Sequence, residues 1–181
     1  AIALMELFNT YIKEGDLDRA KLVSLRLLEK TNYPPHIVHG NLGYIYGEED
    51  NLPLAKKHLK QALAVKKDYS PALNSLGTVR VKEGNLDQAE QLFKQALEHD
   101  PFFTMAKLNL VDIYLITNRP LEGTILLEDI FKTDPHPDAY LILGKILVNN
   151  RQIKEALAVW REGLELSPED ARLKKWIKAY Q

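Results

Sequence analysis

The sequence contains no cysteine, which excludes disulfide frameworks, thiolate catalysis and zinc sites with cysteine ligands. It also lacks a long apolar run, because no stretch approaches the roughly 20 residues that a membrane-spanning helix needs. We therefore expect no membrane span. The missing cysteine does not indicate a compartment, since an absent residue type is compatible with any redox environment.

Net charge is almost absent as well. The 181 residues include 24 basic and 25 acidic side chains, which leaves a charge of -1. A chain with this balance has no bulk attraction to nucleic acid or to an anionic membrane, so only local patches could attract either. We expect no nucleic-acid partner. Hydrophobic residues make up 45% of the chain, which is enough for a folded core.

The chain begins at Ala1 inside an apolar pattern of helical spacing. No initiator methionine is present, and no charged stretch leads into an apolar signal core. We interpret the sequence as an excised or processed piece, so any targeting signal would lie outside it. A soluble protein is expected and the cytoplasm is the favoured compartment, with the actual location left open.

A leucine followed in most cases by glycine recurs at a fixed interval. The pairs are Leu42–Gly43, Leu76–Gly77, Leu110–Val111 and Leu143–Gly144, at steps of 34, 34 and 33 residues. A small residue stands twelve positions after each pair, at Ala55, Ala89, Gly123 and Ala156, and Ala20 fits the same place in an earlier repeat. A period of this length indicates stacked supersecondary units. Five repeats result.

The segment from Ser70 to Phe103 carries the fullest pattern, with Leu76, Gly77, Ala89, Phe93, Ala96 and Pro101 in register. In this spacing and in its 34-residue period the chain resembles the tetratricopeptide repeat (TPR) family. Other repeats match through first-helix tyrosines, a second-helix tryptophan and closing prolines: Tyr11, Tyr46, Tyr114, Trp160, Pro135 and Pro168. The resemblance implies an all-α fold, an α-solenoid whose antiparallel helix pairs wind into a right-handed superhelix.

We expect a single domain over residues 1–181. Its repeats are predicted at about 1–35, 36–69, 70–103, 104–136 and 137–170, with a capping helix at about 168–181. Turns within the helix pairs are predicted at Gly15–Asp16, Asp50–Asn51, Gly84–Asn85 and Asn118–Arg119. The leading residue of each turn tolerates the left-handed conformation that ends a helix. Asn85 and Gln88 have the spacing of a capping box.

The close approach of two helices within a repeat requires small side chains where they meet. The expected partners are Gly43 with Ala55, Gly77 with Ala89 and Gly144 with Ala156.

The last helix is predicted to begin with Ser167 as its N-cap and Pro168 at its first position. Its apolar residues recur at helical spacing: Leu173, Trp176, Ile177 and Tyr180. We expect this stripe to cover the apolar flank of the fifth repeat, because terminal repeats need a cap for solubility. Contact with a membrane or an acidic partner is the alternative.

Arg80 stands where three other repeats carry tyrosine. One interpretation is that its stem packs between helices while its head reaches Glu49 or Glu83. The other is a cation that faces a ligand. We favour the first interpretation.

In TPR solenoids the first helix of each repeat lines a concave surface, where the resemblance implies that a partner binds. In the first three repeats the positions that reach this surface include Asn9, Asn41, Tyr44, Asn74 and Thr78. Their short polar groups could bond the backbone of an extended peptide, or the asparagines could merely solvate the first helices. Gly40 and Gly47 lie one turn to either side of Tyr44, which predicts a notch around its ring.

In the last two repeats the same positions include Leu108, Asn109, Asp112, Leu115, Leu141, Ile142 and Lys145. With Met105 and Val148, the apolar residues among them are expected to form an exposed strip, and such strips usually mark an interface. An amphipathic helix, an apolar peptide or a second copy of the chain would dock there. The alternative is a register shifted by one residue, which would place them in the core between helices.

Catalytic and metal-binding patterns are weak. His36 and His39 are three residues apart and could share a metal, but no local carboxylate pattern completes a site, so a solvated pair is expected. Neither a nucleophile elbow nor a glycine-rich phosphate loop occurs, and we expect no cofactor and no enzyme activity. The carboxylate clamp of chaperone-binding TPR domains is not expected, because Met5, Pro71 and Ser75 replace its cations.

The sequence therefore predicts a non-catalytic scaffold that binds a peptide or protein segment in a concave groove. One alternative is a regulatory or oligomerisation segment cut from a larger multidomain protein or enzyme. A less favoured alternative is an RNA-binding helical-repeat protein, against which the neutral charge argues. The partner itself is not predicted.

Overall fold

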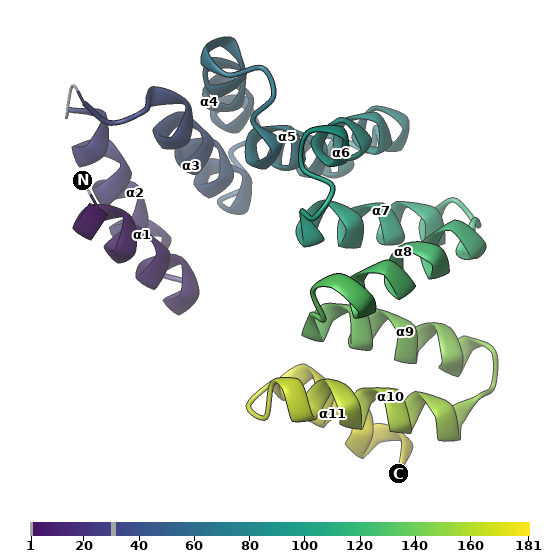
Figure 1. Ribbon diagram of the computed structural model, residues 1–181. Helices are drawn as coiled ribbons and strands as arrows, with labels where there is room; N and C mark the ends of the chain where they lie inside the picture. Colours follow the sequence, from purple (N-terminus) through teal and green to yellow (C-terminus); the bar gives the residue numbers. More distant parts are fainter. Residues whose placement is uncertain (1, 30–31) are drawn as a thin grey trace. The chain divides into compact units, whose positions relative to one another are not determined.

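A computed structural model describes residues 2–29 and 32–181 (Figure 1). These residues form eleven helices and no strand, which confirms the all-α prediction. The helices are α1 (Ile2–Glu14), α2 (Leu17–Leu28), α3 (Pro35–Glu48), α4 (Leu52–Val65), α5 (Ser70–Lys82), α6 (Leu86–His99), α7 (Thr104–Ile116), α8 (Pro120–Thr133), α9 (Pro137–Asn149), α10 (Ile153–Leu166) and α11 (Ala171–Tyr180).

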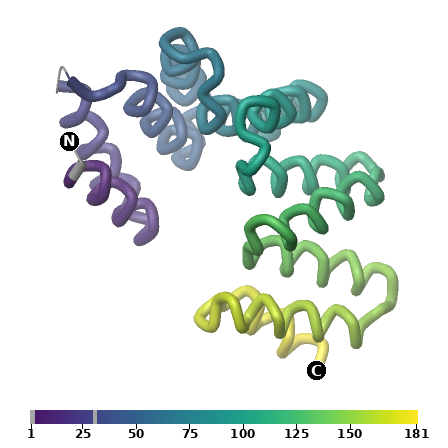
Figure 2. The backbone as a smooth tube through the Cα atoms, in the orientation of Figure 1, coloured from purple at the N-terminus to yellow at the C-terminus, as the bar shows by residue number. Residues whose placement is uncertain are grey.

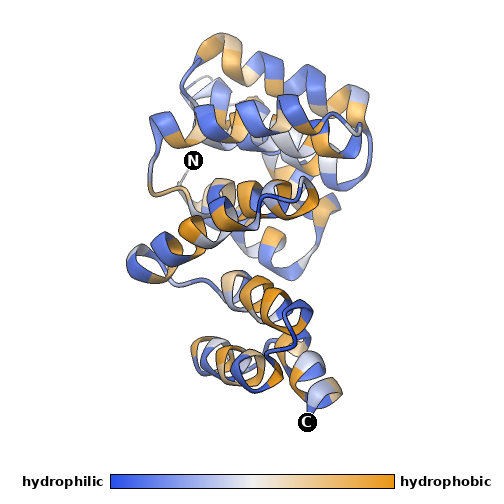
Figure 3. Ribbon diagram, turned by 90° about the vertical axis from the view of Figure 1, so that its right-hand side faces the viewer, coloured by the Kyte–Doolittle hydropathy of each residue, from blue (hydrophilic) through white to orange (hydrophobic). Residues whose placement is uncertain are grey.

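Within each repeat the chain doubles back, so that α1 with α2, α3 with α4, α5 with α6, α7 with α8 and α9 with α10 pack as antiparallel pairs (Figure 2). Apolar and polar residues alternate along the helices, as expected where one face packs and the other meets solvent (Figure 3). Within the described ranges, no helix is both long and apolar enough to cross a membrane.

The chain divides into two compact units, an N-terminal unit (Ala1–Pro101) and a C-terminal unit (Phe102–Gln181). The N-terminal unit contains α1 to α6, and the C-terminal unit contains α7 to α11. Each unit has its own apolar clusters, so the core of each can be described separately. The extent of a single domain over 1–181 stays a prediction.

The turns inside the helix pairs adopt left-handed backbone conformations. The φ angles are 74° at Gly15, 59° at Asp50, 77° at Gly84 and 58° at Asn118, which confirms the four predicted turns. A fifth left-handed residue, Arg151 with φ of 63°, turns the chain between α9 and α10. This position was not predicted, because arginine has no special tolerance for positive φ.

Side-chain caps start several of the second helices. The carboxylate of Asp16 accepts a hydrogen bond from the backbone N–H of Arg19 at 2.9 Å. Asn85 Oδ1 accepts one from the backbone N–H of Gln88 at 3.3 Å, which confirms the Asn85 half of the predicted capping box, but the Asn85 backbone N–H bonds to the carbonyl oxygen of Arg80 at 2.9 Å instead of the Gln88 side chain. These bonds satisfy N–H groups that lack a partner within the helix.

The first-helix glycines do not face the predicted alanines most closely. A Cβ at Gly43 would lie 2.5 Å from Leu59 Cγ, and one at Gly77 would lie 2.5 Å from Phe93 Cε1. The prediction was therefore wrong by one helical turn. The predicted alanine partners are fully buried, but the large side chain four residues later crosses the first helix where it has no Cβ. Gly144 and Trp160 repeat this relationship.

The start of α11 was also predicted wrongly. Ser167 ends α10, because its backbone N–H bonds to the carbonyl oxygen of Gly163 at 3.0 Å. Asp170 is the N-cap of α11, and its Oδ1 accepts from the backbone N–H groups of Arg172 at 2.8 Å and Leu173 at 3.2 Å. A carboxylate accepting two such bonds outcompetes the Ser-Pro signal that lies three residues earlier.

The apolar stripe of α11 packs as expected. Leu173 and Ile177 are buried in a cluster with Trp160, and Trp176 and Tyr180 pack against the same cluster. The Trp160 and Trp176 ring centres lie 5.4 Å apart. The helix thus covers apolar side chains of α9 and α10 within the C-terminal unit.

Arg80 in the N-terminal unit makes an ion pair with Glu83, at 2.6 Å between Nη1 and Oε2. Lys56 of the neighbouring helix also binds Glu83. The arginine head is therefore engaged within the fold, as the first interpretation of Arg80 predicted.

Candidate functional site

The C-terminal unit contains an open hollow of about 250 Å³ between α7, α9 and α11. We call this cavity the hollow. The residues that line it are Met105, Leu108, Asn109, Asp112, Asp138, Leu141, Ile142, Lys145 and Arg172. Six of the predicted partner-binding residues are among them: Leu108, Asn109, Asp112, Leu141, Ile142 and Lys145. The structure thus brings together predicted residues from two repeats.

The floor of the hollow is apolar. Leu108 is only 4% exposed and belongs to a cluster with Val111, Leu127 and Ile130. Leu141 is also 4% exposed and packs in the Trp160 cluster. The prediction that these two leucines lie on an exposed strip is therefore wrong. They belong to the core between helices and show only a small part of their surface to the hollow.

The other residues of the predicted strip differ in exposure. Met105 is 43% exposed at the rim of the hollow, and Ile142 is half-buried. Leu115 and Val148 are half-buried against the Leu108 and Leu141 clusters and do not line the hollow. A continuous apolar strip does not form, because these positions serve the packing of one first helix on the next.

Asp112 supplies a carboxylate on the inner wall of the hollow, where it is open to solvent from the mouth. Removal of water by the surrounding side chains raises the pKa of Asp112, and the nearby charge of Asp138 raises it further. Lys145 opposes this by lowering the pKa through space. Within residues 2–29 and 32–181, no hydrogen bond or ion pair joins the Asp112 carboxylate to another side chain.

Lys145 is held by an aromatic side chain of α11. Its Nζ lies 5.6 Å from the centre of the Trp176 ring, within the range of a cation–π interaction. Trp176 in turn stacks on Tyr180, with ring centres 5.9 Å apart. The position of this cation is therefore tied to the packing of α11.

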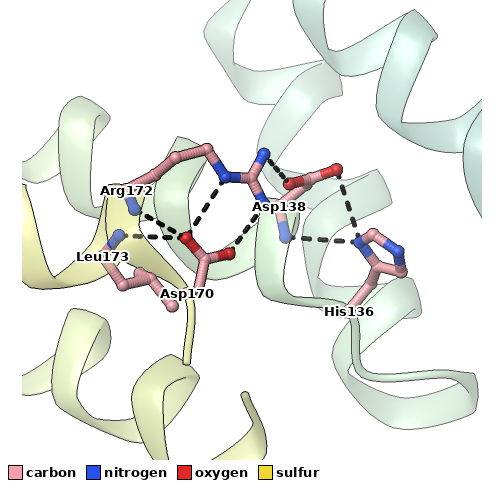
Figure 4. A network of polar contacts seen from close by, with 5 residues as sticks. All are labelled: His136, Asp138, Asp170, Arg172 and Leu173. Carbon is pink, nitrogen blue, oxygen red and sulfur yellow. Dashed lines mark hydrogen bonds and ion pairs between the residues drawn. The ribbon is translucent and has the colours of Figure 1, made fainter. Parts of the chain in front are cut away.

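Arg172 links the starts of α9 and α11 (Figure 4). Its Nη1 lies 2.6 Å from Asp138 Oδ1, and its Nη2 lies 2.7 Å from Asp170 Oδ2. The Asp138 contact is a close approach of opposite charges, so the guanidinium compensates the buried Asp138 Oδ1. Hydrogen bonds from Arg172 lower the pKa of Asp170. The hydrogen bond to Asp170 raises the pKa of Arg172, and the charge of Asp138 raises it by a smaller amount.

A histidine completes this network at the start of α9. The backbone N–H of Asp138 donates to His136 Nδ1 at 3.3 Å, which caps the helix (Figure 4). The backbone of Asp138 is therefore held by the His136 cap, and its carboxylate is held by Arg172.

Asp138 and Arg172 were missed from the sequence. Both occupy the second position of a first helix, the position of Met105, at steps of 33 and 34 residues. Met105 was assigned to the concave surface because it is the second residue of its repeat. The second residue of the fifth repeat is Asp138, so the same assignment would have included it. Treating α11 as the first helix of a sixth repeat would have selected Arg172.

The predicted residues of the N-terminal unit are partly used within the fold. Asn41 Nδ2 approaches Met5 Sδ at 3.8 Å, and Thr78 Oγ1 donates to the carbonyl oxygen of Asn74 at 3.3 Å. Asn9 is exposed. Asn41 and Thr78 therefore have partners within the fold.

The predicted notch around Tyr44 is filled on the Gly40 side, where a Cβ would lie 2.7 Å from Tyr69 Cε1. A Cβ at Gly47 would lie 3.8 Å from Val79 Cγ2, an ordinary contact, so a notch on that side stays a prediction. Tyr44 itself is 38% exposed.

The histidine pair of the structure is not the one in the sequence pattern. His39 Nδ1 lies 3.0 Å from His58 Nδ1, whereas His36 packs edge-on against Tyr69 with ring centres 5.0 Å apart. In the part of the chain that the structure describes, no three His, Cys, Asp or Glu side chains are grouped to hold a metal ion.

Sequence profiles described as tetratricopeptide repeat match residues 48–106 and 80–146, and a second such profile matches residues 137–170. The chain belongs to the tetratricopeptide repeat family. The TPR fold is that of a scaffold for protein interaction. The matched residues include all of the helices that line the hollow except α11.

Solved structures share the fold at low sequence identity. A thermophilic TPR protein of Thermus thermophilus superposes with a TM-score of 0.84 and 19% identity, over 98% of this chain and 97% of that one. A TPR protein of Parabacteroides merdae gives 0.80 and 18%, over 97% and 68%. A chain of the APC/C hetero-tetramer Cut9–Hcn1 gives 0.76 and 17%, over 98% and 35%.

A sequence relative is the protein O-mannosyl-transferase Tmtc3 of Drosophila melanogaster. It is 27% identical over 128 residues, which is 70% of this TPR chain. The chain spans 14% of the length of that relative.

Proposed function

We propose that this TPR chain is a non-catalytic module that binds a peptide or protein segment, one side chain of which enters the hollow. The observation that carries the proposal is the combination of an apolar floor with a charged rim. Leu108 and Leu141 form the floor, while Asp112, Lys145 and Arg172 stand around it. Protein interfaces commonly have this anatomy, with an apolar centre and a polar border.

The size of the hollow favours a single anchoring side chain. Its volume of about 250 Å³ is below the roughly 300–1,000 Å³ of sites for small molecules and cofactors. Its open form is also unlike the enclosed pockets that bury most of a small ligand. A side chain that projects from a longer segment fits both features.

A second candidate function is that of a regulatory or assembly segment in a larger enzyme. The similarity to Tmtc3, of which the chain spans 14%, is the observation that favours it. In that case the hollow would bind another part of the same protein or a subunit of its assembly. The transferase activity is that of the relative, and the proposal for this chain remains one of binding.

Affinity capture tests the proposal. The wild-type chain, a Met105→Lys/Asp112→Lys variant and a Glu155→Lys control are each used as bait in an extract of the native source treated with nuclease. Met105 and Asp112 are exposed residues of the hollow, whereas Glu155 is an exposed residue of α10 outside it. All three proteins are first compared by circular dichroism and thermal melting.

The expected result is a protein retained by the wild type and by the control but lost by the hollow variant. Equal retention by all three would place binding elsewhere and overturn the proposal. A retained second copy of the chain, detected by light scattering, would identify self-association as the use of this surface.

A further inference from the structure

We infer that the side chain received by the hollow is basic, an arginine or a lysine presented by the partner segment. This inference rests on the proposed function and adds the chemistry of the anchoring residue. It is carried by the charges around the hollow, by the unused carboxylate of Asp112 and by the apolar floor.

The cations of the hollow are engaged by the fold. Arg172 contacts both Asp138 and Asp170, so these three residues together carry one excess negative charge. Lys145 is held over Trp176 and balances Asp112 only through space, since no ion pair joins the two. The four charged residues that line the hollow balance in number, but Arg172 is shared between Asp138 and Asp170, which leaves Asp112 as the carboxylate available to a cationic partner group.

Asp112 is the group that a cation would reach. Its carboxylate has no hydrogen bond or ion pair to a described side chain, and it has lost part of its water shell. A guanidinium or ammonium in the hollow would offset both the desolvation and the neighbouring charge of Asp138. A carboxylate in the same place would add a third negative charge beside them.

The floor suits the stem of such a side chain. Arginine and lysine place an apolar stem on apolar surface while the charged head reaches a polar group. Leu108, Leu141 and Ile142 would contact the stem, and Asp112 would accept hydrogen bonds from the head. An apolar partner residue would use the floor but leave Asp112 without compensation.

Three capped tripeptides test the inference: acetyl-Ala-Arg-Ala-amide, acetyl-Ala-Met-Ala-amide and acetyl-Ala-Glu-Ala-amide. Each is titrated into the full ¹⁵N-labelled chain, and binding is followed by amide shifts of the residues that line the hollow. The titrations are repeated with Asp112→Asn and with Asp87→Asn, an exposed aspartate of α6 that serves as the matched control. Asp112→Asn keeps the shape of the side chain and removes its charge.

The arginine peptide is expected to bind about fivefold more tightly than the methionine peptide, and the glutamate peptide more weakly than both. Asp112→Asn should abolish the preference for arginine, and Asp87→Asn should preserve it. If the methionine or glutamate peptide binds as well as the arginine peptide, or if Asp112→Asn keeps the preference, the inference fails while the hollow remains a binding site. If no peptide shifts the hollow, the proposed function fails as well.

Discussion

Arg172 Nη1 lies 2.6 Å from Asp138 Oδ1, so the first turn of α11 is tied to the first turn of α9. The same guanidinium contacts Asp170, the residue that caps α11. One side chain therefore links the cap of the last helix to the rim of the hollow. The C-terminal helix both covers apolar surface and completes the proposed binding site.

Arg172→Ala should weaken both the attachment of α11 and the proposed binding site. Because the side chain is 60% exposed, we expect a loss of about 0.5–1 kcal/mol in the free energy of unfolding, measured by urea denaturation. The hollow would also lose the contact that positions Asp138. The control is Arg161→Ala, an exposed arginine of α10, which should change stability less. Equal stability of the two variants would show that the Arg172 network does not hold α11.

Asp112→Asn should leave stability unchanged or raise it at neutral pH. An acid whose pKa is raised by folding binds its proton more tightly in the folded state, so its ionisation costs stability as pH rises above the unfolded value near 3.8. The asparagine variant lacks this cost. Thermal melts between pH 3 and pH 7 should therefore show the variant gaining on the wild type as pH rises. A lower melting temperature for the variant at pH 7 would indicate a structural role for the carboxylate.

Two glycines of the C-terminal unit should respond to alanine with opposite signs. Gly144→Ala places a Cβ against the Trp160 ring, so we expect a loss of about 1–3 kcal/mol in spite of the better helix propensity. Gly123→Ala places a Cβ 3.5 Å from Val111 Cγ1, an ordinary contact, and should gain about 0.5–1 kcal/mol. Chemical denaturation of both variants measures the difference. Stabilisation by Gly144→Ala would contradict the packing described for α9 and α10.

Acid should destabilise the N-terminal unit through its histidines. Burial lowers the pKa values of His39 and His58, and for His58 the neighbouring His39 and Lys57 contribute as well. These groups are neutral in the folded state, so the unfolded chain takes up more protons as pH falls below about 6.5, and stability declines. Melting temperatures measured from pH 8 to pH 5 should show this decline.

His58→Phe is expected to reduce that decline, because it removes one titrating group and keeps a ring beside Tyr46, whose centre lies 5.4 Å away. The control is His99→Gln, which changes an exposed histidine at the end of α6. The same pH dependence in wild type and His58→Phe would mean that other groups cause the loss.

The helical repeat could be predicted from the sequence because its turns are local features. Gly15, Asp50, Gly84 and Asn118 each mark a left-handed residue, and this property belongs to the residue type itself. Arg151 could not be predicted in this way, since its conformation follows from the geometry of the helix pair. The start of α11 failed for a related reason: Ser167 and Asp170 are both good caps, and the sequence alone does not rank them.

The hollow was predictable only in part. The repeat period brought Asp112 and Lys145 onto the same surface, but it did not show that Leu108 and Leu141 are buried by the next first helix. Burial depends on how closely successive helices approach, and that distance is a tertiary property. The Arg172 contact depends on a helix that the repeat pattern treated only as a cap.

The central claim is that the hollow is where a partner binds, and site-specific photo-crosslinking tests it most directly. A benzophenone amino acid is placed at Met105, on the rim of the hollow, or at Lys154, outside it, and each chain is irradiated in the native extract. Our account predicts a covalent adduct with a partner protein from position 105 and none from position 154. The absence of an adduct at position 105, together with one at position 154, would contradict it.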